Sequence, residues 1–599
     1  MDCPSSRPTV RLADSLSQSE SDWLKTRKEK TLPAMKDFFG HVTIDGFDAA
    51  GYLDRVSSNS SNVPNIGIAA SGGGYRAMLN GAGVVKAFDS RTENSTATGH
   101  LGGLLQSATY FSGLSGGGWL LGSIFINNFT SISDLQTYED GSVWQLENSI
   151  LEGPDTGSIQ LLSSAGYWDD IHDDVEAKSN AGFPTSITDY WGRALSYQFV
   201  NDTKGGPSQT WSSIAKTSDF QDGNMPLPIL VADGRYPQEK ALSSNTTVFE
   251  INPWEIGSFD PTLFGFAPTE FLGSRFDNGE LPQNESCVRG FDSGAFVMGT
   301  SSSLFNQFFL QVNSSALPDW IKSVLEKSLG GIDENSDDIA VYEPSPFYGW
   351  REGSSPFASK RQLDLVDGGE DLQNIPLHPL VQPERGVDVI FAVDNSADTD
   401  YSWPNGTALV ATYERSLNST GIGNGTAFPA VPDQNTFVNK GLNSRPTFFG
   451  CDGSNSTNSD GVVAPLIVYL PNTPYVTFSN VSTFHYPSYN DSYRDLLISN
   501  SYDSATLGNG TSDSNWTTCV GCAILSRSLE RTNTDVPEAC TQCFQKYCWD
   551  GSVDSSQPSP YEPKTMLNEV ELDSAAVVGV APTMLAFVVT AATAVFMMA

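Results

Sequence analysis

The sequence predicts an α/β fold with a mostly parallel central sheet that is covered by helices on both faces. Residues 63–88 and 108–126 each run from an apolar, β-prone stretch through a glycine-rich turn into a helix-compatible stretch. This order is typical of neighbouring βα units in one sheet. The strand candidates are continuously apolar instead of alternating, as expected for strands that are buried on both sides.

The rest of the chain extends this pattern. Residues 1–45 form an N-terminal lead-in with one short amphipathic helix, and residues 46–550 form the main domain, whose end at 519–548 is rich in cysteine. Within that domain, residues 130–225 lack a sustained period, and we expect inserted helices or a lid there. Further strands are expected at 227–232, 247–251, 362–366, 387–393 and 465–470.

Composition excludes some functions. The chain has 599 residues and a formal net charge of −37, so the phosphates of a nucleic acid would be repelled. The short basic run at residues 25–30 is predicted to be the solvated face of a helix. We therefore expect no nucleic-acid partner.

Several features predict passage through the secretory pathway. Asn-x-Ser/Thr sequons are frequent and are candidate glycosylation sites. The eight cysteines are even in number; the spacing of the last five also resembles a zinc ribbon, but disulfides are favoured in an oxidising compartment. The candidate sites are Asn59, Asn94, Asn128, Asn201, Asn245, Asn284, Asn313, Asn405, Asn418, Asn424, Asn455, Asn480, Asn490, Asn509 and Asn515.

The C-terminal tail predicts a lipid anchor. Residues 551–574 read as a Ser/Pro-rich linker, and residues 575–599 are uncharged and apolar with nothing basic after them. Small residues ahead of such a tail match a GPI-attachment signal, with Ser574 as the first candidate and Asp573 or Asn568 behind it. A tail-anchored helix is the alternative. The first residues are not a signal peptide, so we expect the native signal to have been removed or the native start to differ.

The segment Gly113-Leu114-Ser115-Gly116-Gly117 is the leading candidate for a catalytic site. A Gly-x-Ser-x-Gly pattern between a strand and a helix is typical of a nucleophile elbow, the tight turn that exposes a serine hydroxyl at the end of a sheet. Glycines are needed there because the turn crowds its neighbours. Ser115 is therefore the predicted nucleophile, although so short a pattern also arises by chance.

A serine nucleophile needs oxyanion donors and a base. Glycine amides in the loop 71–74, at the start of a predicted helix, suit an oxyanion or a phosphate, but the P-loop pattern is absent. None of the five histidines lies in a compelling context. Asp367 follows a predicted strand and precedes two glycines, which makes it a candidate base, although Asp-Gly-Gly is also a common turn.

Three ordered motifs resemble a known family. Ser-Gly-Gly-Gly-Tyr-Arg-Ala-Met at 71–78, Gly-Leu-Ser-Gly-Gly at 113–117 and Asp-Gly-Gly-Glu at 367–370 look like those of the fungal lysophospholipases, also called phospholipase B. These enzymes are related to the cytosolic phospholipases and the patatins. The resemblance covers about residues 3–549 and includes 249–255 and the terminal cysteines. It implies that residues 46–550 are a catalytic domain with a three-layer, patatin-like variant of the α/β-hydrolase architecture.

The resemblance also implies a mechanism. Ser115 and Asp367 would form a Ser-Asp dyad without histidine, Gly72, Gly73 and Gly74 would form the oxyanion hole, and Arg76 would lie near the substrate phosphate. The substrates would be the fatty acyl esters of lysophospholipids and glycerophospholipids at a membrane or micelle surface. Water or a second lysolipid would release the acyl group. No metal or other cofactor is expected, calcium included.

Two alternatives accompany this prediction. One is a conventional Ser-His-Asp esterase in which His378 or His485 is the base. The other is a non-catalytic, GPI-anchored cell-wall glycoprotein, which would explain the sequons, cysteines and tail but not the catalytic order of the three motifs.

Overall fold

The computed structural model describes residues 3–137, 143–154, 160–236, 242, 245–306, 339–418, 426–483 and 489–567, with the side chains of 160–165 excepted. Six predicted positions lie outside the described residues, as does the apolar tail: Asn313, Asn424, His485, Asn568, Asp573 and Ser574. Among the described helices, none is long and apolar enough to cross a membrane.

The described strands form one twelve-stranded sheet. Its centre is parallel, in the order β12-β10-β2-β3-β4, and antiparallel strands extend it at both ends. The strands are β1 (Arg11–Leu12), β2 (Ile66–Ala70), β3 (Tyr110–Gly113), β4 (Leu227–Arg235), β5 (Thr247–Ile251), β6 (Glu255–Ser258), β7 (Gly265–Pro268), β8 (Ala340–Tyr342), β9 (Leu363–Asp367), β10 (Val389–Asp394), β11 (Thr447–Phe449) and β12 (Leu466–Pro471).

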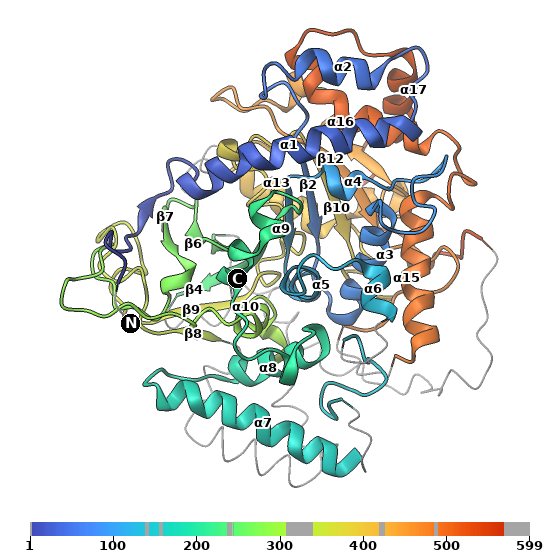
Figure 1. Cartoon of the computed structure of the whole chain (residues 1–599). Coiled ribbons are helices and arrows are strands. Elements are labelled where there is room, and N and C mark those ends of the chain that lie inside the picture. Colours follow the sequence, from blue (N-terminus) through green and yellow to red (C-terminus); the bar gives the residue numbers. More distant parts are fainter. Residues whose placement is uncertain are drawn as a thin grey trace.

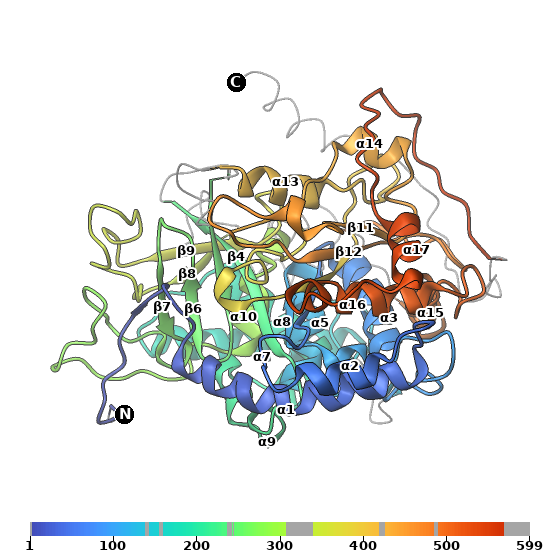
Figure 2. The same ribbon diagram turned by 90° about the horizontal axis from the view of Figure 1, so that it is seen from above.

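Helices surround the sheet. Seen from above, α13 and α14 lie on one side of β11 and β12, and α16 and α3 lie on the other (Figure 2). The helices are α1 (Gln18–His41), α2 (Ala49–Val56), α3 (Gly74–Phe88), α4 (Leu104–Ser107), α5 (Ser115–Ile126), α6 (Ile132–Thr137), α7 (Gln160–Asn180), α8 (Ile187–Phe199), α9 (Ser218–Gln221), α10 (Gly294–Thr300), α13 (Thr407–Ser416), α14 (Gln434–Asn439), α15 (Asp491–Thr506), α16 (Trp516–Arg531) and α17 (Glu538–Tyr547), with short 3-10 turns between them.

The α/β prediction is confirmed. Every predicted strand is present with its bounds shifted by a few residues, and the two predicted βα units, β2-α3 and β3-α5, are parallel neighbours. The segment without a period, residues 130–225, contains helices α6 to α9, and α7 lies at the edge of the molecule away from the strands (Figure 1).

The order of the parallel strands creates the place for a site. From β2 the chain moves to β3 and then to β4 in one direction, whereas β10 and β12 lie on the other side of β2. In open α/β sheets a crevice forms beyond the carboxyl ends of the strands where the order reverses. Here that point lies between β2 and β10, whose ends carry the loop 71–74 and Asn395.

The N-terminal lead-in corrects two predictions. Its helix, α1, has 24 residues, so it is not the short helix that was expected, and it runs across the molecule (Figures 1 and 2). The run 25–30 is not wholly a solvated face, because Arg27 is buried. The Arg27 guanidinium donates to the carbonyls of Ala108 and Gly223, at distances of 3.1 and 2.7 Å. These carbonyls precede β3 and β4, so Arg27 joins the helix to the amino ends of those strands.

All eight cysteines form disulfides, so the zinc-ribbon alternative is wrong. The pairs are Cys3–Cys287, Cys451–Cys548, Cys519–Cys543 and Cys522–Cys540. The last two link α16 to α17, where the cysteine spacing had allowed a metal site.

The described part of the predicted linker lies against the main domain. Residues 551–567 contain no helix or strand. The Asn439 side chain of α14 donates to the carbonyls of Asp554 and Ser556, at 3.0 and 2.7 Å. Farther along, the backbone N–H of Leu567 donates to the carbonyl of Tyr475 at 2.9 Å. The chain is therefore held to the domain up to the last described residue.

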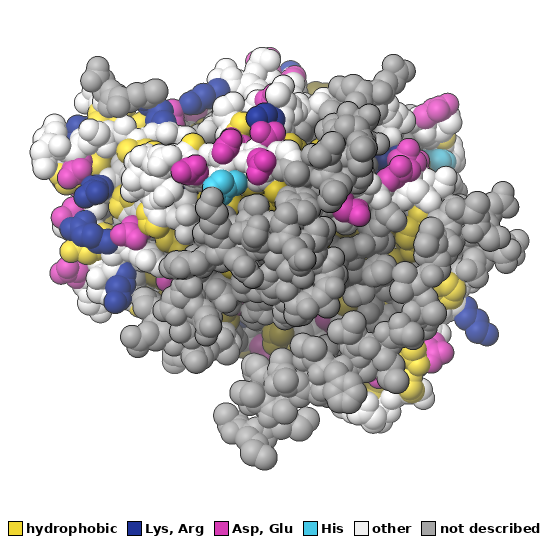
Figure 3. Space-filling model, turned by 90° about the horizontal axis from the view of Figure 1, so that it is seen from below, with side chains coloured by type: hydrophobic (Ala, Val, Ile, Leu, Met, Phe, Trp, Pro, Cys, Tyr) yellow, Lys and Arg dark blue, Asp and Glu magenta, His cyan; other side chains and the backbone are white. Residues whose placement is uncertain are grey.

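Charged side chains of both signs share the surface. On the face seen from below, Lys and Arg lie near Asp and Glu, with exposed hydrophobic side chains between them (Figure 3). The excess of acidic residues is therefore not gathered into a single acidic patch on the described part of that face.

A buried ion cluster ties α1 to the sheet. The Arg385 guanidinium contacts Glu20 of α1 at 3.0 Å and Glu250 of β5 at 2.6 Å, and all three side chains are at most 2% exposed. Burial would lower the pKa of Arg385, but the two carboxylates outweigh it and raise that pKa well above its ordinary value. Arg385 therefore stays charged and compensates two buried anions.

We expect Arg385→Met to lower the free energy of unfolding by about 3–5 kcal/mol, because two carboxylates would stay buried without their cation. The control is Lys25→Met, which breaks the exposed Lys25–Asp22 pair and should leave the unfolding midpoint nearly unchanged, because water screens an exposed ion pair. Chemical denaturation measures both. Equal unfolding midpoints for the two variants would contradict this assignment.

Candidate active site

Ser115 occupies the turn between β3 and α5. Its φ of +49° lies in the left-handed region, which a serine adopts at a cost of roughly 1–3 kcal/mol. Close backbone contacts surround it: a Cβ on Gly116 would lie 2.1 Å from the Gly74 carbonyl oxygen, and one on Gly117 would lie 2.3 Å from that of Ala70. The predicted strand, strained serine turn and helix are all present in this order.

The register of β4 brings Asp367 to this turn. One edge of β4 pairs with β5; its other edge pairs with β3 up to Leu230 and then with β9, where Asp367 lies opposite Ala232. Strand β9 therefore sits just beyond the carboxyl end of β3. Across this short gap, the Ser115 Oγ donates to the Asp367 Oδ2 at 3.0 Å.

Asp367 is buried, with 3% of its surface exposed. Burial raises its pKa to about 7, against the lowering effect of the Gly369 N–H and the Ser115 hydroxyl. The Gly369 N–H donates to the Asp367 Oδ1 at 3.0 Å, which leaves the Oδ2 for the serine. A carboxylate with a pKa near neutrality can accept a proton and later return it.

The glycine loop lies directly beside the serine. A Cβ on Gly72 would lie 3.0 Å from the Ser115 Cβ. The Gly72 N–H donates to the Asn374 carbonyl at 3.0 Å, so that amide is engaged. Gly73 and Gly74 have φ angles of +130° and +62°, and no acceptor among the described residues is recorded for their amides. These two N–H groups stand at the start of α3, where the helix dipole favours an anion.

Arg76 lies behind the glycine loop. It is 1% exposed, and its guanidinium donates to the carbonyls of Asn395 and Val481, both at 2.8 Å. Burial lowers its pKa to about 10, while Asp398 opposes that shift, so the group is cationic at neutral pH. A Cβ on Gly73 would lie 2.5 Å from the Arg76 Nη2, which places the cation against the loop.

His378 belongs to a different cluster. Its Nε2 lies 2.9 Å from the Asp260 Oδ1, and the Asp260 Oδ2 also accepts from Arg415 at 2.6 Å. Among the described residues, the Ser115 hydroxyl donates its hydrogen bond to the Asp367 carboxylate. The geometry thus favours the carboxylate over His378.

The sequence analysis missed three residues that contact the site. Ser301 accepts the Ser115 N–H, Ser303 accepts the Asp367 N–H at 3.0 Å, and Asn374 holds the glycine loop. Ser301 and Ser303 belong to a run of polar residues after α10 that has no motif of its own. Asn374 lies seven positions after Asp367, outside the three motifs. Its closeness to Asp367 in the chain is the one sequence feature that links it to the site.

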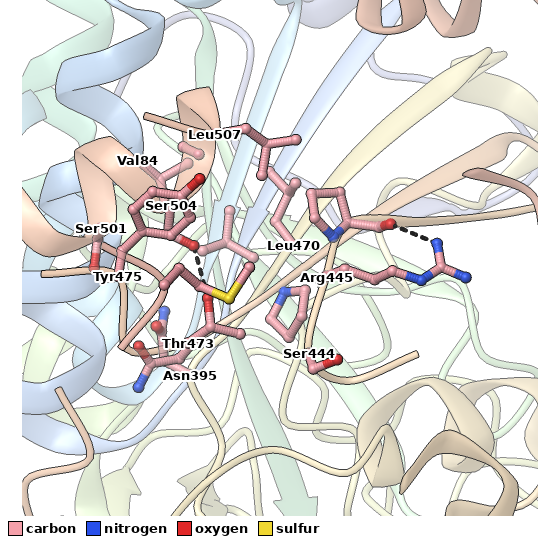
Figure 4. A pocket seen from close by; sticks show the side chains of 16 residues that line it. Val84, Asn395, Ser444, Arg445, Leu470, Thr473, Tyr475, Ser501, Ser504 and Leu507 are labelled. Carbon is pink, nitrogen blue, oxygen red and sulfur yellow. Dashed lines mark hydrogen bonds between the residues drawn. The ribbon is translucent and has the colours of Figure 1, made fainter. Parts of the chain in front are cut away.

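A small cavity of about 50 Å³ lies at the carboxyl ends of β10 and β12. Leu470 and Val393 line it, together with Arg445, Asn395 and Met566 (Figure 4). Ser115 and Asp367 do not line it, so it is separate from the contact between these two side chains. Asn395 is common to the cavity and to the carbonyl contact that holds Arg76.

Known proteins match most of the chain. Residues 66–554 match the family model described as "Lysophospholipase catalytic domain". The chain is 69% identical to Lysophospholipase 1 of Aspergillus fumigatus, over 94% of this chain and 89% of the relative. It is 62% identical to the Lysophospholipase of Penicillium chrysogenum, over 100% of this chain and 96% of the relative.

A solved structure supports the fold class. Human GIVD cytosolic phospholipase A2 superposes with a TM-score of 0.62 at 18% identity, covering 88% of this chain and 69% of that chain. With the extent and identity of the sequence matches, these comparisons confirm the resemblance seen in the three motifs. The chain belongs to the lysophospholipase catalytic domain family.

Proposed function

We propose that this chain hydrolyses fatty acyl esters of lysophospholipids and glycerophospholipids through a Ser115–Asp367 dyad. The observation that carries the proposal is the 3.0 Å contact between the Ser115 Oγ and the Asp367 Oδ2, made at a strained turn between a parallel strand and a helix. The family and its named lysophospholipases supply the substrate class.

In the first half-reaction the Ser115 Oγ attacks the ester carbonyl carbon as Asp367 takes the hydroxyl proton. Negative charge develops on the carbonyl oxygen, and the Gly73 and Gly74 amides are the donors assigned to it, since the Gly72 amide is engaged with Asn374. Collapse of this intermediate breaks the ester bond. Asp367 gives its proton to the leaving alkoxide, and the fatty acyl group stays on Ser115.

In the second half-reaction water attacks the acyl-enzyme. Asp367 accepts a water proton, the serine–acyl bond breaks, and Ser115 recovers its proton as the fatty acid leaves. The hydroxyl of a second lysolipid replaces water in transacylation. Each proton moves between oxygen atoms and Asp367, so these steps use no metal ion, and we propose that calcium is not required.

Arg76 is assigned to the substrate phosphate. Its buried cation lies against the glycine loop, and a planar guanidinium suits phosphate oxygens. In this structure two carbonyls hold it, so its contribution is a fixed positive charge beside the oxyanion loop.

We also propose that the protein is a secreted or surface-held glycoprotein with a GPI anchor attached near Ser574. Support comes from the disulfides and from the sequons, because none of the described candidate asparagines is buried. Asn59, Asn94, Asn128, Asn245, Asn284, Asn455, Asn509 and Asn515 are exposed, and Asn201, Asn405, Asn418, Asn480 and Asn490 are half-buried.

Ser115→Ala and Asp367→Asn should each lower kcat by about 10³-fold or more, because each removes one partner of the proton transfer. His378→Asn, which retains a side-chain amide donor, should stay within about tenfold of the parent. Fatty acid release from lysophosphatidylcholine in EDTA measures all three. A fully active Asp367→Asn together with an inactive His378→Asn would support the conventional triad instead.

The activity should follow the ionisation of Asp367. As a base it must be deprotonated, and its pKa is about 7, so kcat/KM should rise with pH below about 7 and level off above it. The profile is measured with a soluble acyl ester, since micelle properties do not then enter. A profile that stays level from pH 5 to 8 would exclude Asp367 as the base.

The same shift gives a stability prediction. The pKa of Asp367 is raised above its ordinary value of 3.8, so its contribution to stability is fully present below pH 3.8 and is lost as pH rises through about 7. Asp367→Asn, which is always neutral, should be more stable than the parent at pH 8, with this advantage absent near pH 4. Thermal unfolding at both pH values measures the difference.

Treatment with an N-glycosidase should increase the electrophoretic mobility of the protein from its native host, because exposed sequons accept glycans. Phosphatidylinositol-specific phospholipase C should release it from host membranes, and Ser574→Leu should reduce surface retention. A protein that stays membrane-bound after the lipase and is unaffected by Ser574→Leu would favour the tail-anchored helix.

A further inference from the structure

The turn of residues 301–303, between α10 and the 3-10 turn Ser303–Phe305, contacts both members of the catalytic pair. The Ser115 N–H donates to the Ser301 carbonyl at 2.9 Å and to the Ser301 Oγ at 3.1 Å. The Asp367 N–H donates to the Ser303 Oγ at 3.0 Å. Ser301, Ser303 and Ser302 between them are all 0% exposed.

The strain at Ser115 explains why such a contact matters. As the first residue of α5, Ser115 has an N–H without a partner inside the helix, and its φ is +49°. Two acceptors on that N–H, both from Ser301, hold the backbone in a conformation that serine disfavours by itself.

Ser301 is itself fixed to the sheet. Its Oγ donates to the Val231 carbonyl at 2.6 Å, and Val231 precedes Ala232, the residue opposite Asp367 in the β4–β9 pair. The nucleophile and the base come from elements 252 positions apart. The turn thus connects the Ser115 backbone, the β4 backbone and the Asp367 backbone through hydrogen bonds of Ser301 and Ser303.

We propose that Ser301 and Ser303 are positioning residues that set the distance between the Ser115 hydroxyl and the Asp367 carboxylate. They act through the backbones of those two residues and do not touch the reacting atoms. The inference rests on the proposed roles of Ser115 and Asp367. Loss of either serine hydroxyl should therefore slow acyl transfer without weakening substrate binding.

Ser302 supplies a matched control in the same turn. Its Oγ donates to the Met298 carbonyl at 2.8 Å and accepts the Trp191 Nε1–H at 3.0 Å. No contact between its side chain and Ser115 or Asp367 is recorded in the described chain. Ser302→Ala deletes one buried hydroxyl, as Ser301→Ala and Ser303→Ala do, but it leaves the catalytic pair untouched.

The experiment compares these three variants on a soluble p-nitrophenyl acyl ester. Ser301→Ala and Ser303→Ala should lower kcat by about 10- to 100-fold, as small misplacements of reacting groups do, with KM within about twofold of the parent. Ser302→Ala should retain kcat within about twofold. All three should have similar thermal midpoints. Labelling by a fluorophosphonate, in which the Ser115 oxygen bonds to phosphorus and fluoride leaves, should slow in parallel with kcat.

Two further variants test whether misfolding or a failure of the proposed function explains the results. Ser303→Cys fills the same space but is a weak acceptor, so it should be slow even if Ser303→Ala does not fold; a folded Ser303→Cys with full kcat would overturn the proposal. Equal losses in all three alanine variants, in step with their thermal midpoints, would also overturn it. Ser115→Ala separates the two hypotheses: if it retains turnover, the proposed function fails, whereas an inactive Ser115→Ala with a fully active Ser303→Ala refutes this inference alone.

Discussion

The structure depends on one constraint, which is that a strained serine and a desolvated carboxylate must meet at a hydrogen-bonding distance. Ser115 needs a tight turn at the end of β3, and Asp367 needs to arrive from β9 at the same point. Strand β4 satisfies both demands because its length lets it pair first with β3 and then with β9 along one edge. The glycines of the three motifs serve the same end, since they allow backbones to approach where a Cβ would collide.

Burial of Asp367 has a stability cost that the rest of the domain must offset. Its raised pKa means that the folded protein resists ionising it. Some other buried charges are compensated: Arg385 lies between Glu20 and Glu250, and Asp260 lies between Arg415 and His378. Asp367 and Asp233, two buried carboxylates with raised pKa values, lie on the paired strands β9 and β4 beside the proposed chemistry, which fits the general tendency of perturbed groups to gather at functional sites.

The comparison with human GIVD cytosolic phospholipase A2 concerns the fold alone. At 18% identity the two chains still superpose over 88% of this one, whereas Lysophospholipase 1 of Aspergillus fumigatus and the Lysophospholipase of Penicillium chrysogenum are 69% and 62% identical to it. The sheet and its order of strands therefore tolerate extensive substitution.

The sequence by itself determined the fold class and the family, because glycine-flanked motifs and continuously apolar strands leave local signals. The same motifs predicted Ser115 and Asp367 as a catalytic pair, and in the structure their side chains lie 3.0 Å apart. Disulfide formation was predicted, but not which cysteines pair. Ser301, Ser303 and Asn374 were not predictable, since they act through backbone contacts that carry no motif. The basic run misled for a related reason: Arg27 is buried because carbonyls from two distant loops surround it. Only the tertiary structure decided these features, because each depends on contacts between separate elements that form when the chain folds; for Ser301 and Ser303 the pairing of β4 with β3 and β9 brings those elements together.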